Sequence, residues 1–253
     1  MLEKPMPQRA PAMSPRLEAR IAGALYLSVI LLGGFAEIGV RQGLVVAGDP
    51  VATALAIKSH EAFFRLGFAA EVMTNVIAVP VTLIIYRLLV PAGPFLALLA
   101  VVLDLTQNTI NAVNAWTQFA PITLLGASPD LAAIPPAELA ALARLALKWH
   151  DVGFAIGLTF FGFALVIEGA LIFRSKYFPQ WLGLLYALAG VCYLINSFAN
   201  FLAPSLPIFP YILFPCLIGE AAFCLWLLVV GVDEAKWRAA AARASNPALV
   251  EPT

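Results

Sequence analysis

Long apolar runs dominate the pattern of hydrophobic and polar positions along this 253-residue chain. A helix that crosses the roughly 30 Å hydrocarbon core of a bilayer needs about 20 predominantly apolar residues. Six segments satisfy this requirement, at residues 21–40, 66–89, 96–119, 152–173, 182–202 and 211–230. The pattern therefore predicts an all-α fold, a polytopic membrane bundle of six transmembrane helices.

The segments outside these runs predict the domain boundaries and the orientation. Residues 1–15 are Pro-rich and polar, so we expect a disordered tail, followed by a transmembrane domain at 16–232 and a C-terminal tail at 233–253. An even number of spans puts both tails on one side. That side holds ten Lys and Arg residues against five on the other. Because basic residues favour the cytoplasmic side, we expect both termini to be cytoplasmic.

The connection between the third and fourth spans, residues 121–149, carries a helical pattern of its own. Pro135 and Pro136 favour a helix start. Apolar residues then repeat at helical spacing, at Leu139, Leu142, Leu145, Ala146 and Trp149. This pattern predicts an amphipathic helix on the outer membrane surface. A simple connector remains compatible with the same residues.

Two prolines fall inside predicted spans, Pro80 in the second and Pro215 in the sixth. A proline in a helix removes one backbone hydrogen bond and favours a kink. Interrupted helices often line transport sites, although kinks also occur in membrane bundles for purely structural reasons.

The third span contains a row of polar residues among Leu, Val and Ala. Its members are Asp104, Gln107, Asn108, Asn111, Asn114 and Gln118. At about 100° per residue they fall on one side of a helix. Because lipid surrounds a span, we expect this side to face other helices or a wet cavity.

Polar residues on the other spans gather mainly in the outer half of the membrane, which predicts a carboxylate-containing cavity that opens outward. The candidate ligand or cavity residues are Glu37, Glu71, Asn75, Asp104, Asn108, Asn111, Asn114, His150, Asp151, Asn196, Asn200 and Glu220. Arg41 is spaced to neutralise Glu37, Arg65 to neutralise Glu71, and Arg174 to neutralise Glu168. The alternative is that these residues form interhelical hydrogen bonds that hold the bundle together.

Composition narrows the class of protein further. Hydrophobic residues make up 62% of the chain and charged residues 12%, and the mean hydropathy is +0.90, outside the range of soluble domains. Lys plus Arg and Asp plus Glu both number 15, and the chain has no basic tract that indicates a nucleic-acid partner. The three cysteines lie in apolar runs without a CxxC pair, so we expect buried thiols. The expected partners are membrane lipids.

Residues 139–196 resemble one known family. The motifs are the Lys148-Trp149-His150-Asp151 tetrapeptide and the stretch EGALIFRSKYFPQWLGLLYALAGVCYLIN at residues 168–196. The stretches ARIAG at 19–23 and FFRLGFAAE at 63–71 fit more weakly. Together they resemble a bacterial family of integral membrane proteins of unknown function, the DUF4386 type. The resemblance implies a multi-pass protein of the bacterial inner membrane, and it implies no activity.

The sharpest chemical pair is His150 and Asp151, which we expect at the outer start of the fourth span. There Asp151 would cap a helix N-terminus, or His150 would turn inward toward Glu37, Glu71 or His60. The chain has no GxSxG motif and only two histidines, so no catalytic motif and no cofactor is predicted.

Taken together, these patterns predict a protein that binds or transports a small polar solute or a lipid. The alternatives are a membrane-embedded enzyme or metal- or haem-binding protein that uses His150 and Asp151, and a non-catalytic accessory subunit.

Overall fold

A computed structural model describes residues 13–206 and 211–245, so most of the predicted disordered tail at 1–15 lies outside the described residues. In the described part all regular secondary structure is helical, and there is no strand. The elements are α1 (Pro15–Gly34), η1 (Phe35–Arg41), α2 (Gln42–Leu44), α3 (Pro50–Ser59), α4 (Glu61–Leu89), η2 (Val90–Ala92), α5 (Pro94–Leu125), η3 (Pro129–Leu131), α6 (Pro136–Ser175), α7 (Gln180–Leu202), α8 (Leu213–Val229) and α9 (Glu234–Ser245).

Local sequence accounts for several helix starts. Ser14 caps α1, where its hydroxyl accepts the backbone N–H of Leu17. Asp49 caps α3 in the same way through the N–H of Ala52, at 2.8 Å. Side-chain oxygens at these positions satisfy backbone N–H groups that have no partner inside the helix.

The predicted all-α polytopic fold is confirmed. Within the described residues, five helical segments are long and apolar enough to cross a membrane: Pro15–Leu44, Glu61–Ala92, Pro94–Leu125, Pro136–Ser175 and Gln180–Leu202. The predicted sixth span corresponds to α8, which has 17 residues and is followed after a 100° bend by α9. The chain is therefore a multi-pass membrane protein by length and composition.

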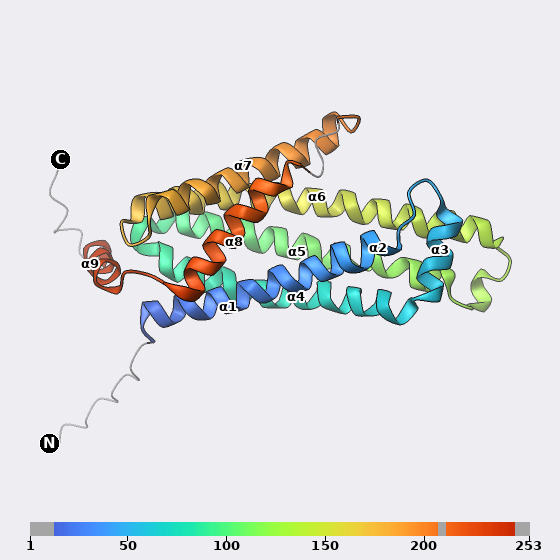
Figure 1. The fold of residues 1–253 in the computed structure, drawn as a ribbon, viewed down its shortest axis with the longest axis horizontal. Coiled ribbons are helices and arrows are strands. Elements are labelled where there is room, and N and C mark those ends of the chain that lie inside the picture. Colours follow the sequence, from blue (N-terminus) through green and yellow to red (C-terminus); the bar gives the residue numbers. More distant parts are fainter. Residues whose placement is uncertain (1–12, 207–210, 246–253) are drawn as a thin grey trace, which may run out of the picture.

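The helices run along one long axis, and α1 begins at the end of the molecule where α9 lies (Figure 1). Contacts at this end join the two parts of the chain: Arg16 Nε donates to the carbonyl of Val230, and Trp237 Nε1 donates to that of Leu88. At the opposite end α3 crosses the long helices (Figure 1). Both ends of the described chain thus lie at the same end of the bundle.

The prediction of a separate surface helix at 137–149 is wrong. These residues form the first part of α6, a 40-residue helix that continues into the fourth span. No proline or turn interrupts the chain between Trp149 and Val152. The buried face also differs from the predicted one: Ala140, Ala143 and Leu147 are buried, whereas Leu142, Leu145 and Trp149 are exposed.

Of the two prolines predicted to interrupt spans, one does lie inside a helix and the other lies at a helix start. Pro80 lies inside α4 as expected. Pro215, however, is the third residue of α8, where a proline removes no intrahelical hydrogen bond. A further proline, Pro121, lies inside α5, which extends to Leu125 past the predicted end of the third span.

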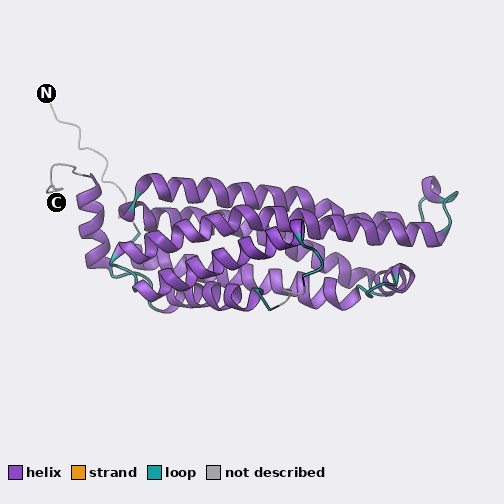
Figure 2. Ribbon diagram, turned by 90° about the horizontal axis from the view of Figure 1, so that it is seen from above, coloured by secondary structure: helices purple, strands orange, loops and turns teal. Residues whose placement is uncertain are grey.

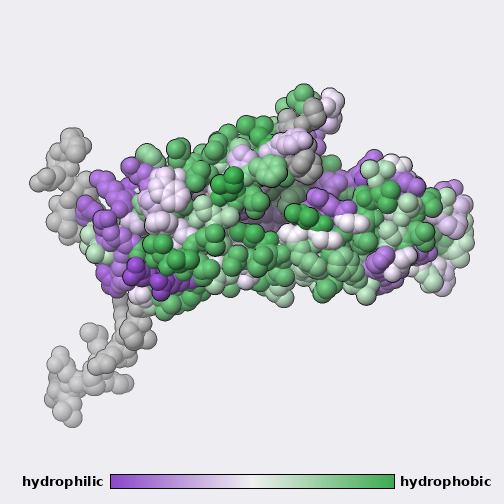
Figure 3. All heavy atoms as spheres, viewed as in Figure 1, coloured by the Kyte–Doolittle hydropathy of each residue, from purple (hydrophilic) through white to green (hydrophobic). Residues whose placement is uncertain are grey.

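Two apolar cores stabilise the bundle. The larger core joins α1, α4, α6, α7 and α8 around residues such as Leu165, Tyr186 and Phe223, and it contains Cys192, Cys216 and Cys224 as buried free thiols. The smaller core, around Val40, Ile57, Phe64 and Leu147, fills the end of the bundle near α3. The long helices lie side by side in both views (Figures 1 and 2). On the face shown in Figure 3, hydrophobic residues cover the middle and hydrophilic residues gather at the end near α9.

Candidate functional site

A π-helical turn in the first span places two opposite charges on one face. The element η1 continues α1 in seven residues of π-helix and contains Glu37 and Arg41. The two side chains form an ion pair, and Glu37 Oε1 also accepts a hydrogen bond from Gln42 Nε2 at 2.9 Å. Single π-helical turns are rare and are found frequently at functional sites.

Arg41 points into the bundle and joins three helical segments. Its Nη1 donates to Gln118 Oε1 on α5 at 2.9 Å and lies 3.5 Å from Glu71 Oε2 on α4. The Arg41 side chain is only 8% exposed, and that of Glu71 is 14% exposed. A guanidinium removed from water requires such partners, because an unpaired buried charge costs several kcal/mol.

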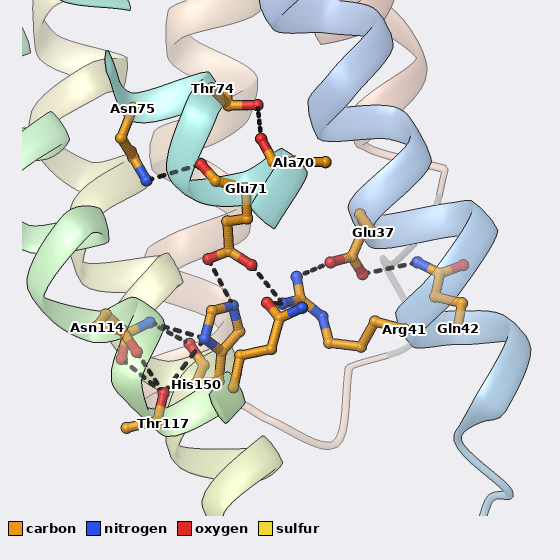
Figure 4. A network of polar contacts seen from close by, with 11 residues as sticks. Glu37, Arg41, Gln42, Ala70, Glu71, Thr74, Asn75, Asn114, Thr117 and His150 are labelled. Carbon is orange, nitrogen blue, oxygen red and sulfur yellow. Dashed lines mark hydrogen bonds and ion pairs between the residues drawn. The ribbon is translucent and has the colours of Figure 1, made fainter. Parts of the chain in front are cut away.

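Glu71 lies between Arg41 and His150 (Figure 4). Its Oε1 is 3.4 Å from His150 Nε2, at ion-pair distance but without the alignment of a hydrogen bond. On the other side of the ring, Nδ1 faces the Thr117 hydroxyl at 3.2 Å and the Asn114 amide nitrogen at 3.4 Å. Because the amide nitrogen can only donate, Nδ1 acts as the acceptor. In the neutral ring the proton is therefore on Nε2, the nitrogen on the Glu71 side of the ring.

Three buried nitrogen atoms in this cluster have no hydrogen-bond acceptor. They are Arg41 Nε, Gln118 Nε2 and His150 Nε2, which lies at ion-pair distance from Glu71. The orientation of Gln118 follows from its neighbour, because Arg41 can only donate and so faces the carbonyl oxygen of the amide. Buried polar groups in proteins are nearly always satisfied, and an exception calls for an explanation such as a bound molecule.

The asparagines of α5 and α4 extend the network. Asn114 Nδ2 donates to the His150 carbonyl at 2.8 Å, and Asn108 Nδ2 donates to the Asn75 carbonyl at 2.9 Å. Asn75 Nδ2 in turn donates to the carbonyl of Glu71 at 3.1 Å. Asn111 is buried, as the polar row on the third span predicts.

Glycines on α6 make room for two of these asparagines. A Cβ atom at Gly153 would collide with the side-chain amide of Asn114, and one at Gly157 would collide with that of Asn111. Beside Asn114 the surface is hollowed by a groove of about 350 Å³. Its lining residues are Thr109, Ile110, Val113, Asn114, Trp116 and Gly153.

A second polar cluster lies deeper in the bundle. Glu220 on α8 accepts a hydrogen bond from Tyr26 at 2.8 Å and one from Tyr193. The hydroxyls of Tyr26 and Tyr186 are 3.2 Å apart. The remaining carboxyl groups of this cluster belong to Asp104 and Glu168, which lie next to each other.

A comparison with known protein families matches residues 21–231 to the family described as "Domain of unknown function (DUF4386)". This chain belongs to the DUF4386 family. A curated relative, an "Uncharacterized protein" from Archaeoglobus fulgidus, is 36% identical over 76 residues. The match covers 30% of this chain and 44% of the relative, so it spans less than half of that protein's length. No solved structure matches this chain.

In this DUF4386 protein the predicted site residues separate into two groups and several outliers. Glu37, Glu71, Asn75, Asn108, Asn114 and His150 belong to the cluster around Arg41. Asp104 and Glu220 belong to the deeper cluster with Glu168. Asn196 and Asn200 lie on α7, and neither side chain has a hydrogen bond within residues 13–206 and 211–245.

The predicted position of His150 and Asp151 at a helix start is wrong. Because α6 begins at Pro136, the two residues lie inside the helix, and Asp151 cannot cap it. His150 is buried and turned inward to Glu71, one of the predicted partners, whereas Asp151 is exposed. His60 precedes α4, is exposed, and faces the carbonyl of Ala56 instead.

Two predicted charge pairs are also wrong. Arg65 pairs with Glu61 at 2.8 Å rather than with Glu71. Glu168 is buried beside Asp104, and Arg174 is exposed. The pairing of Arg41 with Glu37 is confirmed.

Some residues of both clusters escape the sequence patterns. Tyr26, Tyr186 and Tyr193 resemble ordinary aromatic residues of a span, and only a carboxyl group on another helix gives their hydroxyls a partner. Thr117 is equally inconspicuous, because a threonine hydroxyl in a membrane helix usually bonds to its own backbone. Among the described residues no group of three or more His, Cys, Asp and Glu side chains is arranged to hold a metal ion.

Proposed function

We propose that this protein binds and transports a small polar solute that carries a hydrogen-bond-accepting group, such as a carboxylate or phosphate. Arg41 is the main anchor. The observation that carries this proposal is that Arg41 Nε and Gln118 Nε2, two of the buried donors of this cluster, have no acceptor. An incoming oxygen atom would satisfy both donors, and an anionic group would in addition be attracted by the guanidinium.

Glu37 is the residue that such a solute would displace. Its side chain is 38% exposed, against 8% for Arg41. It therefore lies at the mouth of the cluster, while Glu71 remains behind as the deeper partner of the guanidinium. Displacement exchanges one carboxylate for another acceptor, so the buried cation is never left unpaired.

Glu37 and Arg41 both lie on the π-helical element η1, and this position supports the idea that the first span moves. A π-helical turn holds one residue more than an α-helical turn needs, and a shift between the two forms rotates the side chains that follow. Such a shift would rotate Arg41 away from Glu71. We infer that the cluster opens to the outer side of a bacterial inner membrane, with both termini in the cytoplasm.

The anionic group that binds Arg41 could also belong to a lipid headgroup instead of a soluble molecule. The groove beside Asn114 is lined mainly by apolar residues, and Asn114 itself donates to the carbonyl of His150. An acyl chain fits such a surface better than a water-soluble solute does. Soluble anions and anionic lipids are therefore tested separately.

The test is the thermal unfolding midpoint of the purified full-length protein in detergent. The probes are acetate, inorganic phosphate and short-chain phosphatidylglycerol, with glycerol as a neutral control. An anion that binds the folded protein raises the midpoint. We expect this increase in the wild type and in Arg65→Gln, which removes an exposed arginine, and no increase in Arg41→Gln. An equal increase in Arg41→Gln, or none in the wild type with any anion, would contradict the proposal.

An enzymatic function is the second candidate, and one observation favours it. Thr117, His150 and Glu71 follow one another at 3.2 and 3.4 Å, an order that resembles a nucleophile, a base and an orienting carboxylate. However, the Thr117 hydroxyl donates to the Asn114 carbonyl at 2.6 Å and is buried. Loss of a substrate turnover in Thr117→Val with unchanged anion binding would favour this candidate over transport.

A further inference from the structure

The cluster of Asp104, Glu168 and Glu220 concentrates three carboxyl groups inside the bundle. Asp104 and Glu168 are 6% and 2% exposed. They come from α5 and α6, and Glu220 comes from α8. Within the described residues, none of the three forms an ion pair with Lys, Arg or His. The charge of this cluster is therefore not balanced by a cation.

Without a cation, bound protons are what remains to neutralise the negative charge of these carboxyl groups. Two carboxylates in contact at low dielectric cannot both stay ionised, because each loses its hydration and repels the other. Asp104 also has a buried carboxyl oxygen, Oδ1, without any hydrogen-bond partner. Such an oxygen is the acceptor that a proton on the neighbouring carboxyl group requires.

Glu220 differs from this pair. Two tyrosine hydroxyls donate to it, from Tyr26 and Tyr193, so its negative charge is satisfied by hydrogen bonds. Around the three carboxyl groups the other titratable side chains are Tyr186, next to Glu168, and the thiols of Cys216 and Cys224, near Glu220. All of these groups are neutral or acidic.

The tyrosines connect the two parts of the cluster. Tyr26 donates to Glu220, and its oxygen is 3.2 Å from the hydroxyl of Tyr186, which adjoins Glu168. A chain of hydroxyl and carboxyl groups thus crosses α8, α1, α7 and α6. In such a chain each oxygen gains one proton as it gives up another, so O–H bonds formed equal O–H bonds broken.

We infer that Asp104 and Glu168 form a proton-binding site in the membrane interior, and that its proton exchanges with Glu220 through Tyr186 and Tyr26. The ligand of this site is H⁺. The site is separate from the proposed solute anchor at Arg41 and does not depend on it. A membrane protein with such a site is able to couple its conformation to a proton gradient.

The test is infrared spectroscopy of the full-length protein in lipid nanodiscs at neutral pH. A protonated carboxyl group gives a C=O stretching band that carboxylates lack, and the band shifts when H₂O is replaced by D₂O. We expect this band in the wild type, its loss in Glu168→Gln and in Asp104→Asn, and its retention in Glu138→Gln, which changes an exposed glutamate on the same helix. Absence of the band in the wild type at neutral pH would overturn the proton-binding site whether or not any variant folds.

The exchange route has its own test. Tyr26→Phe keeps all three carboxyl groups but breaks the hydroxyl chain. We expect the band to remain and its shift in D₂O to become several-fold slower. Tyr211→Phe, which removes the hydroxyl of an exposed tyrosine outside the chain, leaves the rate unchanged. An unchanged rate in Tyr26→Phe would overturn the route through the tyrosines.

Discussion

The two polar clusters of this bundle are both buried, yet their charges are balanced in opposite ways. Around Arg41, a guanidinium is held by Glu37, Glu71 and Gln118. Around Glu168, three carboxyl groups meet tyrosine hydroxyls and no described cation. The first arrangement depends on fixed charges of both signs, and the second on protons. This difference predicts that equivalent substitutions have unequal effects in the two clusters.

The largest effect is expected for Arg41→Gln. It leaves Glu71 and part of Glu37 without a cation, and breaking a buried pair in this way typically costs about 3–5 kcal/mol of unfolding free energy. Unfolding of the purified protein by SDS titration in mixed micelles measures the loss. The double variant Arg41→Gln/Glu71→Gln should recover part of it. A loss below about 1 kcal/mol would mean that the pair is solvated rather than buried.

The next effect concerns the packing that holds Glu168. A Cβ atom at Gly183 on α7 would lie 2.5 Å from the Gly169 carbonyl and from the Phe173 nitrogen on α6. Because both contacts are backbone atoms, Gly183→Ala should force the helices apart at a cost of about 1–3 kcal/mol. The same unfolding assay should show little change for Gly43→Ala, where no atom lies within 4 Å of the added carbon. Equal losses in both variants would contradict this close approach.

A smaller effect is expected for Thr117→Val, which keeps the shape of the side chain but removes the hydroxyl that faces His150. The loss of one buried hydrogen bond costs about 0.5–1.5 kcal/mol. The orientation of the ring should loosen, which nitrogen-15 NMR of the histidine ring detects as a mixture of the two neutral tautomers. If one tautomer persists, Asn114 alone is sufficient to hold the ring.

The smallest effect on stability is expected for Glu168→Gln. An amide resembles a protonated carboxyl group in shape and charge, so the change should cost less than about 1 kcal/mol. Both Arg41→Gln and Glu168→Gln introduce the same amide side chain. A difference in their cost would therefore reflect the different charge balance of the two clusters. A loss as large as that of Arg41→Gln would show that Glu168 is ionised and paired.

The sequence carries enough information for the fold and for part of the site. Apolar runs of membrane length and the polar row on the third span predict the spans and the inward direction of Asn111 and Asp104. Pro135 and Pro136 mark the start of α6 correctly. The buried face of its first part is not predictable in this way, because it is formed by alanines such as Ala140 and Ala143, whereas Leu142 and Leu145 point outward. Small residues mark close helix packing in membranes, and hydrophobicity alone does not identify that face.

Pairing between helices is the other part that sequence leaves open. Spacing correctly pairs Arg41 with Glu37, since both lie on one helix, and wrongly pairs Glu168 with Arg174 for the same reason. The actual neighbours of Glu168 come from α5 and α7, and they are brought together only by tertiary packing. A residue such as Tyr186 gains its role from that packing.

The length of α6 has a mechanical consequence. His150 and Glu168 lie on this one uninterrupted helix, and their separation corresponds to about five full turns, or roughly 27 Å at 1.5 Å per residue. Because the separation is a whole number of turns, both side chains lie on the same face of α6. His150 contacts Glu71 and Glu168 lies next to Asp104, so one rigid helix takes part in both clusters. A rigid rod cannot slide or rotate at one of these points alone. A sliding or rotation of α6 that releases His150 from Glu71 therefore also changes the distance between Glu168 and Asp104.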